Sequence, residues 1–372
     1  MTRLLLTVPT FFGTEATLAH EIRSLGYETS EVTDGRVTFE GDMEAIAVAN
    51  VNLRCGERVL IKMAEFKAKT FEELFEGVRK APWENFIGKN CAFPVKGSSV
   101  SSTLSSVPAC QSIVKKAVVK RLGEKYGIEF FEETGPMMRV QFSLFKDNAV
   151  IYIDTTGEPL YKRGYRAKGV AAPLRETLAY SMIDITRWRG DRPFADVFCG
   201  SGTIPIEAAL YAKNIAPGKN RTFVSEKWTD ELKGLYKDAR EEALENETPD
   251  ASVRIHASDI DPAAVKLAIE NAKRAGVEKF IDFKVCDMKD APLFTDKGVL
   301  CSNPPYGERL MDKKSSAILY RKMGEKFQKF ENIGKYILTS HEEFEKFYGK
   351  NADKKRKLYN GMLKCYLYQY FK

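Results

Sequence analysis

Residues 196–204 read Asp-Val-Phe-Cys-Gly-Ser-Gly-Thr-Ile, and this stretch decides the fold class. The apolar run 194–198 predicts a buried strand, and residues 204–212, just after the glycines, predict a helix. Glycines at such a turn let the backbone approach a ligand closely, and the first turn of the helix presents free N–H groups. A dinucleotide-binding fingerprint would need a third glycine at position 205, where the chain has Pro205. The stretch therefore argues against a NAD site and favours a different ligand at the same place in an α/β fold.

Three aspartates stand at the ends of consecutive predicted strands. Asp196 closes the strand before the glycines, where it can reach a cationic ligand such as a sulfonium-bearing amino acid. Asp259 ends the strand 252–258 and is placed to accept both ribose hydroxyls of a bound nucleoside, with a helix cap as its alternative role. Asp287 ends the next strand and either meets an adenine amino group or is an ordinary turn residue.

The most specific signal follows the buried strand 298–302 and reads Asn303-Pro304-Pro305-Tyr306-Gly307. Two consecutive prolines cannot continue the sheet, so the chain must turn out at its carboxyl edge. An exocyclic amine on a base is a poor nucleophile, because its lone pair is shared with the ring. The Asn303 side-chain oxygen and a proline-aimed backbone carbonyl can accept the amine's hydrogens and localise that lone pair. Tyr306 offers a face on which the base stacks.

Strands separated by helices fill the second half of the chain and predict a parallel sheet with both faces covered. The expected strands are 194–198, 252–258, 281–286, 298–302, 335–339 and a final extended run at 362–371; the expected helices are 173–186, 204–212, 262–275 and 315–330. A polar insertion rich in Glu and Lys interrupts the pattern at about 218–250.

The first half alternates short strands and helices in two modules. Strands at 4–8, 37–39 and 58–66 with helices at 14–25 and 42–51 predict a small ferredoxin-like unit. Helices at 71–78 and 108–126, strands at 92–96, 138–145 and 149–154, and a polar loop at 97–102 make the second module. The helix 108–126 carries five basic residues on its polar surface, which indicates either a solvated face or a face toward phosphates.

Length and charge set the broader limits. A chain of 372 residues predicts two or three domains, and 44% apolar with 29% charged residues is ordinary globular composition. The net charge of +7 suits a polyanionic partner without proving one. No run approaches the roughly 20 apolar residues of a membrane helix, and the apolar stretch 4–8 is better explained as a buried strand than as a signal peptide.

The seven cysteines and three histidines form no ligand cluster. No C-x-x-C pair occurs, and no histidine is close in sequence to another histidine or to a cysteine. We therefore expect no metal site, and reduced cysteines without an export signal indicate the cytoplasm. Cys199, inside the glycine turn, is expected to act as a small buried apolar residue.

These motifs in this order resemble the class I S-adenosylmethionine-dependent methyltransferases that modify amino groups. Further segments narrow the resemblance to the bacterial THUMP-domain RNA methyltransferases, similar to the large-subunit (23S) ribosomal RNA guanine-N2-methyltransferase. Those segments are Arg163-Gly164-Tyr165-Arg166, the run 172–178 (Ala-Pro-Leu-Arg-Glu-Thr-Leu), the run 214–218 (Asn-Ile-Ala-Pro-Gly) and Tyr359-Asn360-Gly361. The resemblance covers nearly the whole chain and is strongest over residues 160–310.

The resemblance implies a ferredoxin-like domain at 1–66, a THUMP RNA-binding domain at 67–155 and a class I methyltransferase domain with a Rossmann-like sheet at 156–372. It implies that S-adenosylmethionine is the cofactor and that structured RNA is the partner. The methionine end of the cofactor would meet Asp196, Phe198, Gly200, Ser201 and Gly202, with Glu176 and Thr177 near its amino-acid group; Asp259 would hold the ribose, Asp287 the adenine, and Asn303, Pro304, Pro305 and Tyr306 the target base.

Other functions stay open at this point. A transfer-RNA guanine-N2 methyltransferase and a DNA adenine-N6 methyltransferase could both use the turn at 303–306. The DNA enzyme would need a DNA-reading module, and the sequence shows no helix-turn-helix. A basic N-terminal α/β module suits structured RNA better, because such RNA is read largely by its shape and backbone. A third alternative, an inactive RNA-binding protein on a methyltransferase scaffold, is weakened because both ends of the expected active site are present. The oligomeric state cannot be inferred.

Overall fold

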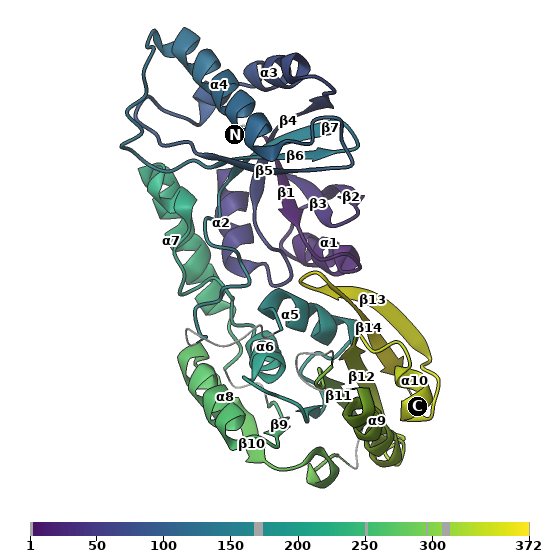
Figure 1. Ribbon diagram of the computed structural model, residues 1–372. Coiled ribbons are helices and arrows are strands. Elements are labelled where there is room, and N and C mark those ends of the chain that lie inside the picture. Colours follow the sequence, from purple (N-terminus) through teal and green to yellow (C-terminus); the bar gives the residue numbers. More distant parts are fainter. Residues whose placement is uncertain (1–2, 167–173, 250–251, 295–296, 307–312, 372) are drawn as a thin grey trace.

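The computed structural model describes residues 3–166, 174–249, 252–294, 297–306 and 313–371. These residues form two seven-stranded sheets, one in each half of the chain, which confirms the expected α/β class. Figure 1 shows the N-terminal half stacked on the C-terminal half, with the final hairpin at their junction. No helix in the described ranges is long and apolar enough to cross a bilayer.

The N-terminal sheet joins the two predicted modules into one continuous layer. In spatial order its strands are β2 (Thr29–Thr33), β3 (Arg36–Gly41), β1 (Leu4–Pro9), β4 (Leu60–Lys67), β7 (Asn148–Asp154), β6 (Val140–Phe145) and β5 (Val95–Val100). Its helices are α1 (Glu15–Ser24), α2 (Met43–Asn52), α3 (Phe71–Arg79) and α4 (Val107–Tyr126), with a short 3-10 turn at Trp83–Asn85. The antiparallel pairing of β4 with β7 joins the modules, and one hydrophobic core runs beneath both.

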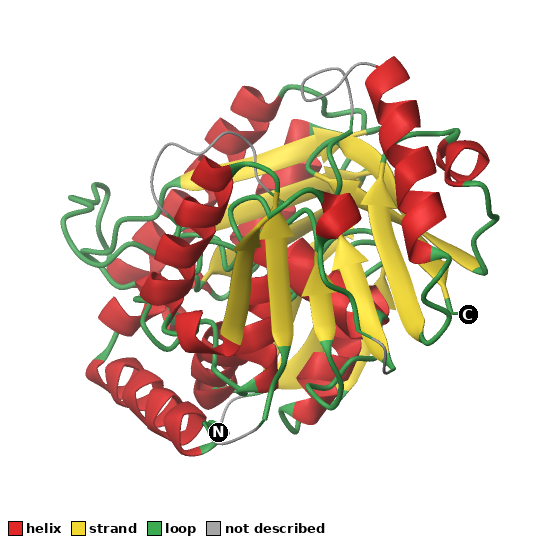
Figure 2. Ribbon diagram, turned by 90° about the horizontal axis from the view of Figure 1, so that it is seen from below, coloured by secondary structure: helices red, strands yellow, loops and turns green. Residues whose placement is uncertain are grey.

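The C-terminal sheet has five parallel strands and an antiparallel edge. In spatial order its strands are β10 (Ile281–Val285), β9 (Ile255–Asp259), β8 (Phe194–Asp196), β11 (Gly298–Ser302), β12 (Ile333–Thr339), β14 (Leu363–Tyr370) and β13 (Lys354–Asn360). Its helices are α5 (Glu176–Ile185), α6 (Thr203–Ala212), α8 (Pro262–Ala275), α9 (Lys313–Phe327) and α10 (Phe344–Tyr348); 3-10 turns lie at Glu278–Phe280 and Met288–Asp290. Figure 2 shows helices on both faces of this sheet. In a parallel sheet of this kind, ligands bind outside the carboxyl ends of the strands.

Three elements differ from the expectations. The predicted polar loop at 97–102 is largely strand β5, and the Phe142 ring would lie 2.4 Å from a Cβ at Gly97, so glycine is needed there for close packing rather than for a turn. Strands β2 and β13 were not predicted, because both are polar and lie on sheet edges, where apolar alternation is weak. Pro173, the predicted start of the helix now assigned to 176–185, lies outside the described residues.

The polar insertion at 218–249, here called the strap, ties the C-terminal half to the N-terminal half. It contains a 3-10 turn, Val224–Lys227, and the helix α7 (Asp230–Glu245), which lies along α2 in Figure 1. The Tyr236 ring is fully buried in the N-terminal core, and its hydroxyl contacts Asn50 Nδ2 at 2.9 Å and Ser225 Oγ at 2.7 Å. The strap is therefore a structural clamp between the two halves.

Candidate active site

The tips of β8 and β11 meet through one buried hydrogen-bond relay. Ser302 Oγ donates to Asp196 Oδ1 at 2.7 Å and accepts from the backbone N–H of Val197 at 3.2 Å. The N–H of Phe198 donates to the same carboxylate oxygen at 3.1 Å. Because Ser302 immediately precedes Asn303, the relay places the asparagine turn beside the acidic end of β8. The two sequence signals that lie about a hundred residues apart are brought together.

Asp196 is a buried acid without a cation beside it in the described structure. Its side chain is fully enclosed, and burial raises its pKa from 3.8 to about 7, partly offset by its hydrogen bonds to Ser302 and Phe198. The nearby charge of Asp259 raises the pKa further. An unpaired carboxylate in such a place costs free energy, and a cationic ligand would remove that cost.

The glycine turn lies between β8 and α6 and is held by Asp259. The carboxylate Oδ2 of Asp259, at the tip of β9, accepts the N–H of Gly200 at 2.9 Å. Gly200 and Gly202 have φ angles of 52° and 85°, in the left-handed region that favours glycine. A Cβ on Gly202 would lie 2.9 Å from Ala268 of α8, whereas a Cβ on Gly200 would meet nothing within 4 Å. Gly202 therefore permits close packing of a helix, and the space over Gly200 is open to a ligand.

The side-chain oxygen of Asn303 is an unused acceptor. Asn303 Oδ1 is buried and has no hydrogen-bond partner among the described residues. Buried polar atoms are nearly always paired, so an exception at the carboxyl edge of a sheet indicates a missing donor. An amino group of a bound base is a donor of the right kind. Pro304 is buried next to it, and Pro305 is half-buried and accepts the Tyr320 hydroxyl at 3.4 Å through its carbonyl oxygen.

Tyr306 does not present the open stacking face that the sequence predicted. Its ring is only 7% exposed and belongs to the C-terminal core. Asn360 Nδ2, at the end of β13, donates to the Tyr306 hydroxyl at 3.2 Å, and the Cys365 thiol lies 3.7 Å from it. Burial raises the pKa of Tyr306 well above its ordinary value. In this structure the tyrosine anchors the proline turn to the terminal hairpin, a contact that no local sequence pattern could reveal.

Glu176 is connected to the start of α6 through Arg166. The Nε of Arg166 donates to Glu176 Oε1 at 2.6 Å, and its Nη2 donates to Thr203 Oγ1 at 2.9 Å. Thr203 is the first residue of α6, directly after the glycines. Burial raises the pKa of Glu176 to about 7, and the positive charge of Arg166 opposes the rise. Arg166 therefore connects this acid to the helix that follows the turn.

Thr177 faces the N-terminal half instead of the glycine turn. Its hydroxyl donates to Glu57 Oε1 at 2.6 Å, and the other carboxylate oxygen of Glu57 pairs with Arg175 at 3.2 Å. The sequence suggested that Thr177 lies near the cofactor's amino-acid group, but its hydroxyl is already used in this contact. A residue from the first module thus fixes the start of α5.

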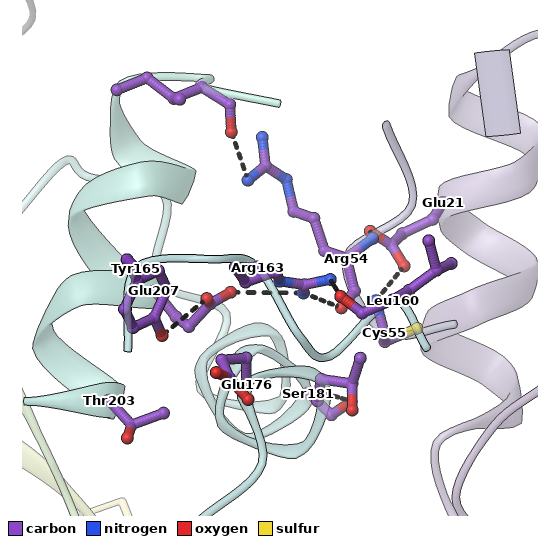
Figure 3. A network of polar contacts seen from close by, with 12 residues as sticks. Glu21, Arg54, Cys55, Leu160, Arg163, Tyr165, Glu176, Ser181, Thr203 and Glu207 are labelled. Carbon is purple, nitrogen blue, oxygen red and sulfur yellow. Dashed lines mark hydrogen bonds and ion pairs between the residues drawn. The ribbon is translucent and has the colours of Figure 1, made fainter. Parts of the chain in front are cut away.

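Arg163 and Tyr165 of the basic segment 163–166 are buried. Arg163 donates to the carbonyl of Leu160 at 2.8 Å and to the carbonyl of Arg54, and it pairs with Glu207 Oε2 at 3.4 Å. Figure 3 shows Arg163 between Glu207 of α6 and the N-terminal backbone, with Tyr165 donating to the same acid at 3.1 Å. The segment therefore joins the N-terminal half to the helix that carries the glycine turn.

The remaining predicted residues have local roles as well. Asp287 Oδ1 accepts the N–H of Lys289 at 2.9 Å and caps the short 3-10 turn after β10, which fits its alternative role as a turn residue. Asp261 caps α8 by accepting the N–H of Ala263. Cys199 is buried, and burial raises the pKa of its thiol far above the ordinary value, so it carries no thiolate.

Comparison with known families agrees with this arrangement. Residues 163–369 match the model of a family described as RMKL-like, methyltransferase domain. Residues 5–60 match the RlmL ferredoxin-like domain, and residues 68–154 match the THUMP domain. Three separate models thus match three consecutive parts of the chain.

Individual relatives match over the whole chain. YpsC of Bacillus subtilis (strain 168), a proposed RNA methyltransferase, is 49% identical over 99% of this chain and 95% of its own length. The ribosomal RNA large subunit methyltransferase K/L of Psychromonas ingrahamii is 33% identical over 98% of this chain, which spans about half (49%) of that relative. The crystal structure of SMU.472, a proposed methyltransferase complexed with SAH, superposes with a TM-score of 0.93 at 43% identity and covers 100% of this chain and 98% of its own.

Proposed function

The chain belongs to the RMKL-like methyltransferase family, and we propose that it transfers a methyl group from S-adenosylmethionine to the N2 amino group of a guanine in ribosomal RNA. The coarser part of this statement, a methyltransferase that uses S-adenosylmethionine and acts on RNA, follows from the family and from relatives named for that activity. The single observation that carries the chemistry is the buried, unpartnered Oδ1 of Asn303 beside the tip of β8.

The residues at the carboxyl edge of the sheet fit the cofactor. Asp196 is an enclosed acid without a positive partner among the described residues, and it suits the cofactor's ammonium or sulfonium charge. The open space at Gly200 leaves room for the methionine portion, and the start of α6 supplies free N–H groups. Asp259 keeps acceptor capacity for ribose hydroxyls while it fixes the glycine turn. Bound there, S-adenosylmethionine supplies an electrophilic methyl group.

The chain's own contribution to the reaction is orientation. Asn303 Oδ1 accepts one hydrogen of the base's amino group, which turns the nitrogen lone pair toward the electrophile. The two prolines after Asn303 hold this acceptor in place, so little reorganisation is needed at the moment of transfer. No strong base has to act before attack, because the amine can lose its second proton to solvent after the carbon–nitrogen bond has formed.

Ribosomal RNA is favoured over the alternatives by the relatives and by the N-terminal half. The K/L relatives are named for ribosomal RNA of the large subunit, and residues 5–60 match a domain described as RlmL ferredoxin-like. A substrate of this kind and seven unpaired cysteines among the described residues suit the cytoplasm. Transfer RNA and DNA adenine are outcomes of the test below.

The test is direct identification of the product. The full chain is incubated with methyl-labelled S-adenosylmethionine and, in separate reactions, ribosomal RNA and transfer RNA from a strain that lacks the enzyme, and unmethylated DNA. Nucleosides are then separated and identified by mass spectrometry. Labelled N2-methylguanosine from ribosomal RNA supports the proposal. Label in transfer RNA alone, or N6-methyladenine in DNA alone, would replace it with the corresponding alternative.

A further inference from the structure

The face of the N-terminal sheet that its helices leave uncovered contains a basic groove. The strand register places the helix-facing residues of all its central strands in one core, so α1 to α4 cover the same side. The opposite side holds a groove of about 480 Å³ that crosses the junction of the first and second modules. Among the residues that line it, four are basic and none is acidic; the basic ones are Arg36, Arg58, Lys96 and Arg139.

A single buried carboxylate arranges two of these arginines. Asp154 Oδ2, at the end of β7, accepts from Arg58 at 2.7 Å, from Arg139 at 3.4 Å and from Gln141 at 2.9 Å. The Asp154 side chain is fully buried, so it holds the guanidinium groups without facing the groove. Arg36 is fixed separately, because it donates to the Tyr152 hydroxyl at 3.0 Å. Four cations against one carboxylate leave the groove positive, with its donors preorganised.

The basic side chains of α4, the helix predicted at 108–126, are less available to bind phosphates. On α4, Arg121 pairs with Glu84 at 2.6 Å, and Lys125 pairs with the same acid at 3.4 Å. Lys115 pairs with Glu133, and Lys120 lies 3.5 Å from Glu124. Most of the helix's cations are thus compensated within the fold. In the groove, by contrast, Arg36 and Lys96 form no ion pair with any described residue.

An aromatic path leads from the groove to the active site. Gly35 lines the groove, and a Cβ on it would lie 3.4 Å from the ring of Phe12. Phe12 is 54% exposed, and its ring meets that of Tyr359 edge-on, with 5.9 Å between the ring centroids. The next residue, Asn360, holds Tyr306 of the proline turn. An exposed aromatic ring thus lies between the cationic groove and the base-binding turn.

The loop that carries Phe12 is fixed in place. Glu15 accepts the N–H of Gly13 and the N–H of Gly35, each at 2.9 Å. A Cβ on Gly13 would lie 2.6 Å from the carbonyl oxygen of Lys357, so the loop is tightly seated on β13. Figure 1 shows the terminal hairpin lying against the N-terminal half at this point. Phe12 is therefore a preorganised surface feature between the two halves.

We infer that the groove binds consecutive backbone phosphates of a single-stranded segment of the RNA substrate, and that Phe12 stacks a base of that strand before it reaches Asn303. The inference rests on the proposed function and adds a track for the RNA to it. Guanidinium forks match phosphate oxygens, and an aromatic face accepts any base. The same protein would use the basic sheet face for the backbone and the methyltransferase half for one base.

Binding measurements with matched variants of the full chain test the track. The double variant R36Q/K96Q removes two groove charges without touching Asp154, and K116Q/K120Q removes two exposed charges from α4 as the control. Fluorescence anisotropy with a labelled single-stranded RNA of about 12 nucleotides gives the affinity at several salt concentrations. We expect R36Q/K96Q to lose at least about tenfold in affinity and to lower the salt slope by about 0.7 for each phosphate that is no longer neutralised. The control is expected to stay within about threefold.

The role of Phe12 is tested in the same binding assay with two variants, one without the aromatic ring and one that keeps it. F12A is expected to weaken RNA binding about tenfold, because it removes the aromatic ring on which a base stacks. F12Y keeps the flat ring and should bind like the wild type. Titration with S-adenosylmethionine should give the same affinity for every variant, and R36K/K96R, which keeps both charges, guards against a folding defect.

The outcomes separate this inference from the reaction itself. Unchanged RNA affinity in R36Q/K96Q, or equal losses in R36Q/K96Q and K116Q/K120Q, would show that the groove does not bind the RNA backbone. This conclusion would hold even if the wild type methylates RNA. Binding of inorganic phosphate alone in the groove, with RNA affinity unaffected by R36Q/K96Q, would also overturn it, as a small-anion site. Selective loss in R36Q/K96Q together with no methyl transfer by the wild type would support the track and reject the proposed function.

Discussion

The buried charge of Asp196 makes the stability of the ligand-free protein depend on pH. Its pKa is raised from 3.8 to about 7, so folding favours the protonated form. The resulting stabilisation is fully present below pH 4 and is lost as the pH rises through 7. One pKa unit corresponds to about 1.4 kcal/mol, so the change across this window is about 4 kcal/mol in order of magnitude.

D196N isolates this contribution. The amide oxygen can accept the same hydrogen bonds from Ser302 and Phe198, but the side chain no longer titrates. Its buried amino group carries a cost of its own, about 1–3 kcal/mol, which is the same at both pH values. The free energy of unfolding of D196N is therefore compared with that of the wild type at each pH. The prediction concerns how this difference changes from pH 5 to pH 8. Glu176, whose pKa is also raised, is present in both and cancels.

Equilibrium urea unfolding at pH 5 and pH 8 supplies the measurement, followed by tryptophan fluorescence. Trp188 packs on Phe194 of β8, with 4.9 Å between ring centroids, and reports this half of the chain. From pH 5 to pH 8 the wild type should lose about 2–3 kcal/mol of unfolding free energy that D196N keeps. This is less than the full change, because part of that change falls below pH 5. The wild type should also bind S-adenosylmethionine more tightly as the pH rises from 6 to 8, and D196N should not. If the difference in unfolding free energy between the two proteins is the same at both pH values, the pKa of Asp196 is not raised by burial.

The other predictions concern contacts that hold the site. Y236A should lower the stability of the chain by about 3–5 kcal/mol and Y236F by about 1 kcal/mol, since only the first leaves a large cavity under the strap; equal melting temperatures for the two would contradict the clamp. G202A should destabilise the fold more than G200A: both positions have a positive φ, which costs an alanine about 1–2 kcal/mol, but only a Cβ on Gly202 would also clash with a neighbouring helix. G200A should bind S-adenosylmethionine more weakly, and calorimetry of both variants checks the order of their stabilities. N360A removes the donor to the Tyr306 hydroxyl and should slow methyl transfer severalfold with cofactor affinity unchanged, so an unaltered rate in a single-turnover assay would count against the anchor.

The sequence predicted the strand tips well because their signals are local. A strand, a glycine turn and a helix follow one another within 196–212, and a strand stopped by two prolines has few structural interpretations. The carboxyl ends of parallel strands must meet at one edge, so residues at those ends converge whatever their spacing. For this reason the order of motifs along the chain is enough to place Asp196 and Asn303 together.

The contacts between the two halves could not be predicted in the same way. The strap reads as a polar insertion, because only one side of α7 is apolar and its partner, α2, lies about 180 residues earlier. Thr177 resembled a cofactor contact, but Glu57 of another module takes its hydroxyl. The Tyr306 ring looked free to stack, but a terminal hairpin covers it. Such pairings depend on how domains dock, and spacing along the chain carries no record of that.

The charged surfaces could not be predicted from the sequence either, as α4 shows. Five basic residues on one helix left a solvated face and a phosphate-facing surface equally open, and acids from other elements pair with three of them. The groove's arginines come from β3, the segment before β4 and the segment before β6, where no local cluster exists. A count of charges along the chain could not distinguish these two surfaces.

Asn303→Ala tests the central claim most directly, because this side chain supplies the buried acceptor at the end of β11. Methyl transfer to RNA is measured in single turnover, and S-adenosylmethionine affinity is measured by isothermal titration on the same preparation. We predict a loss of at least about a hundredfold in transfer, in line with removal of one preorganised hydrogen-bonding group, with cofactor affinity within a few-fold of the wild type. Transfer near the wild-type rate, or an equal loss of cofactor binding, would contradict the account.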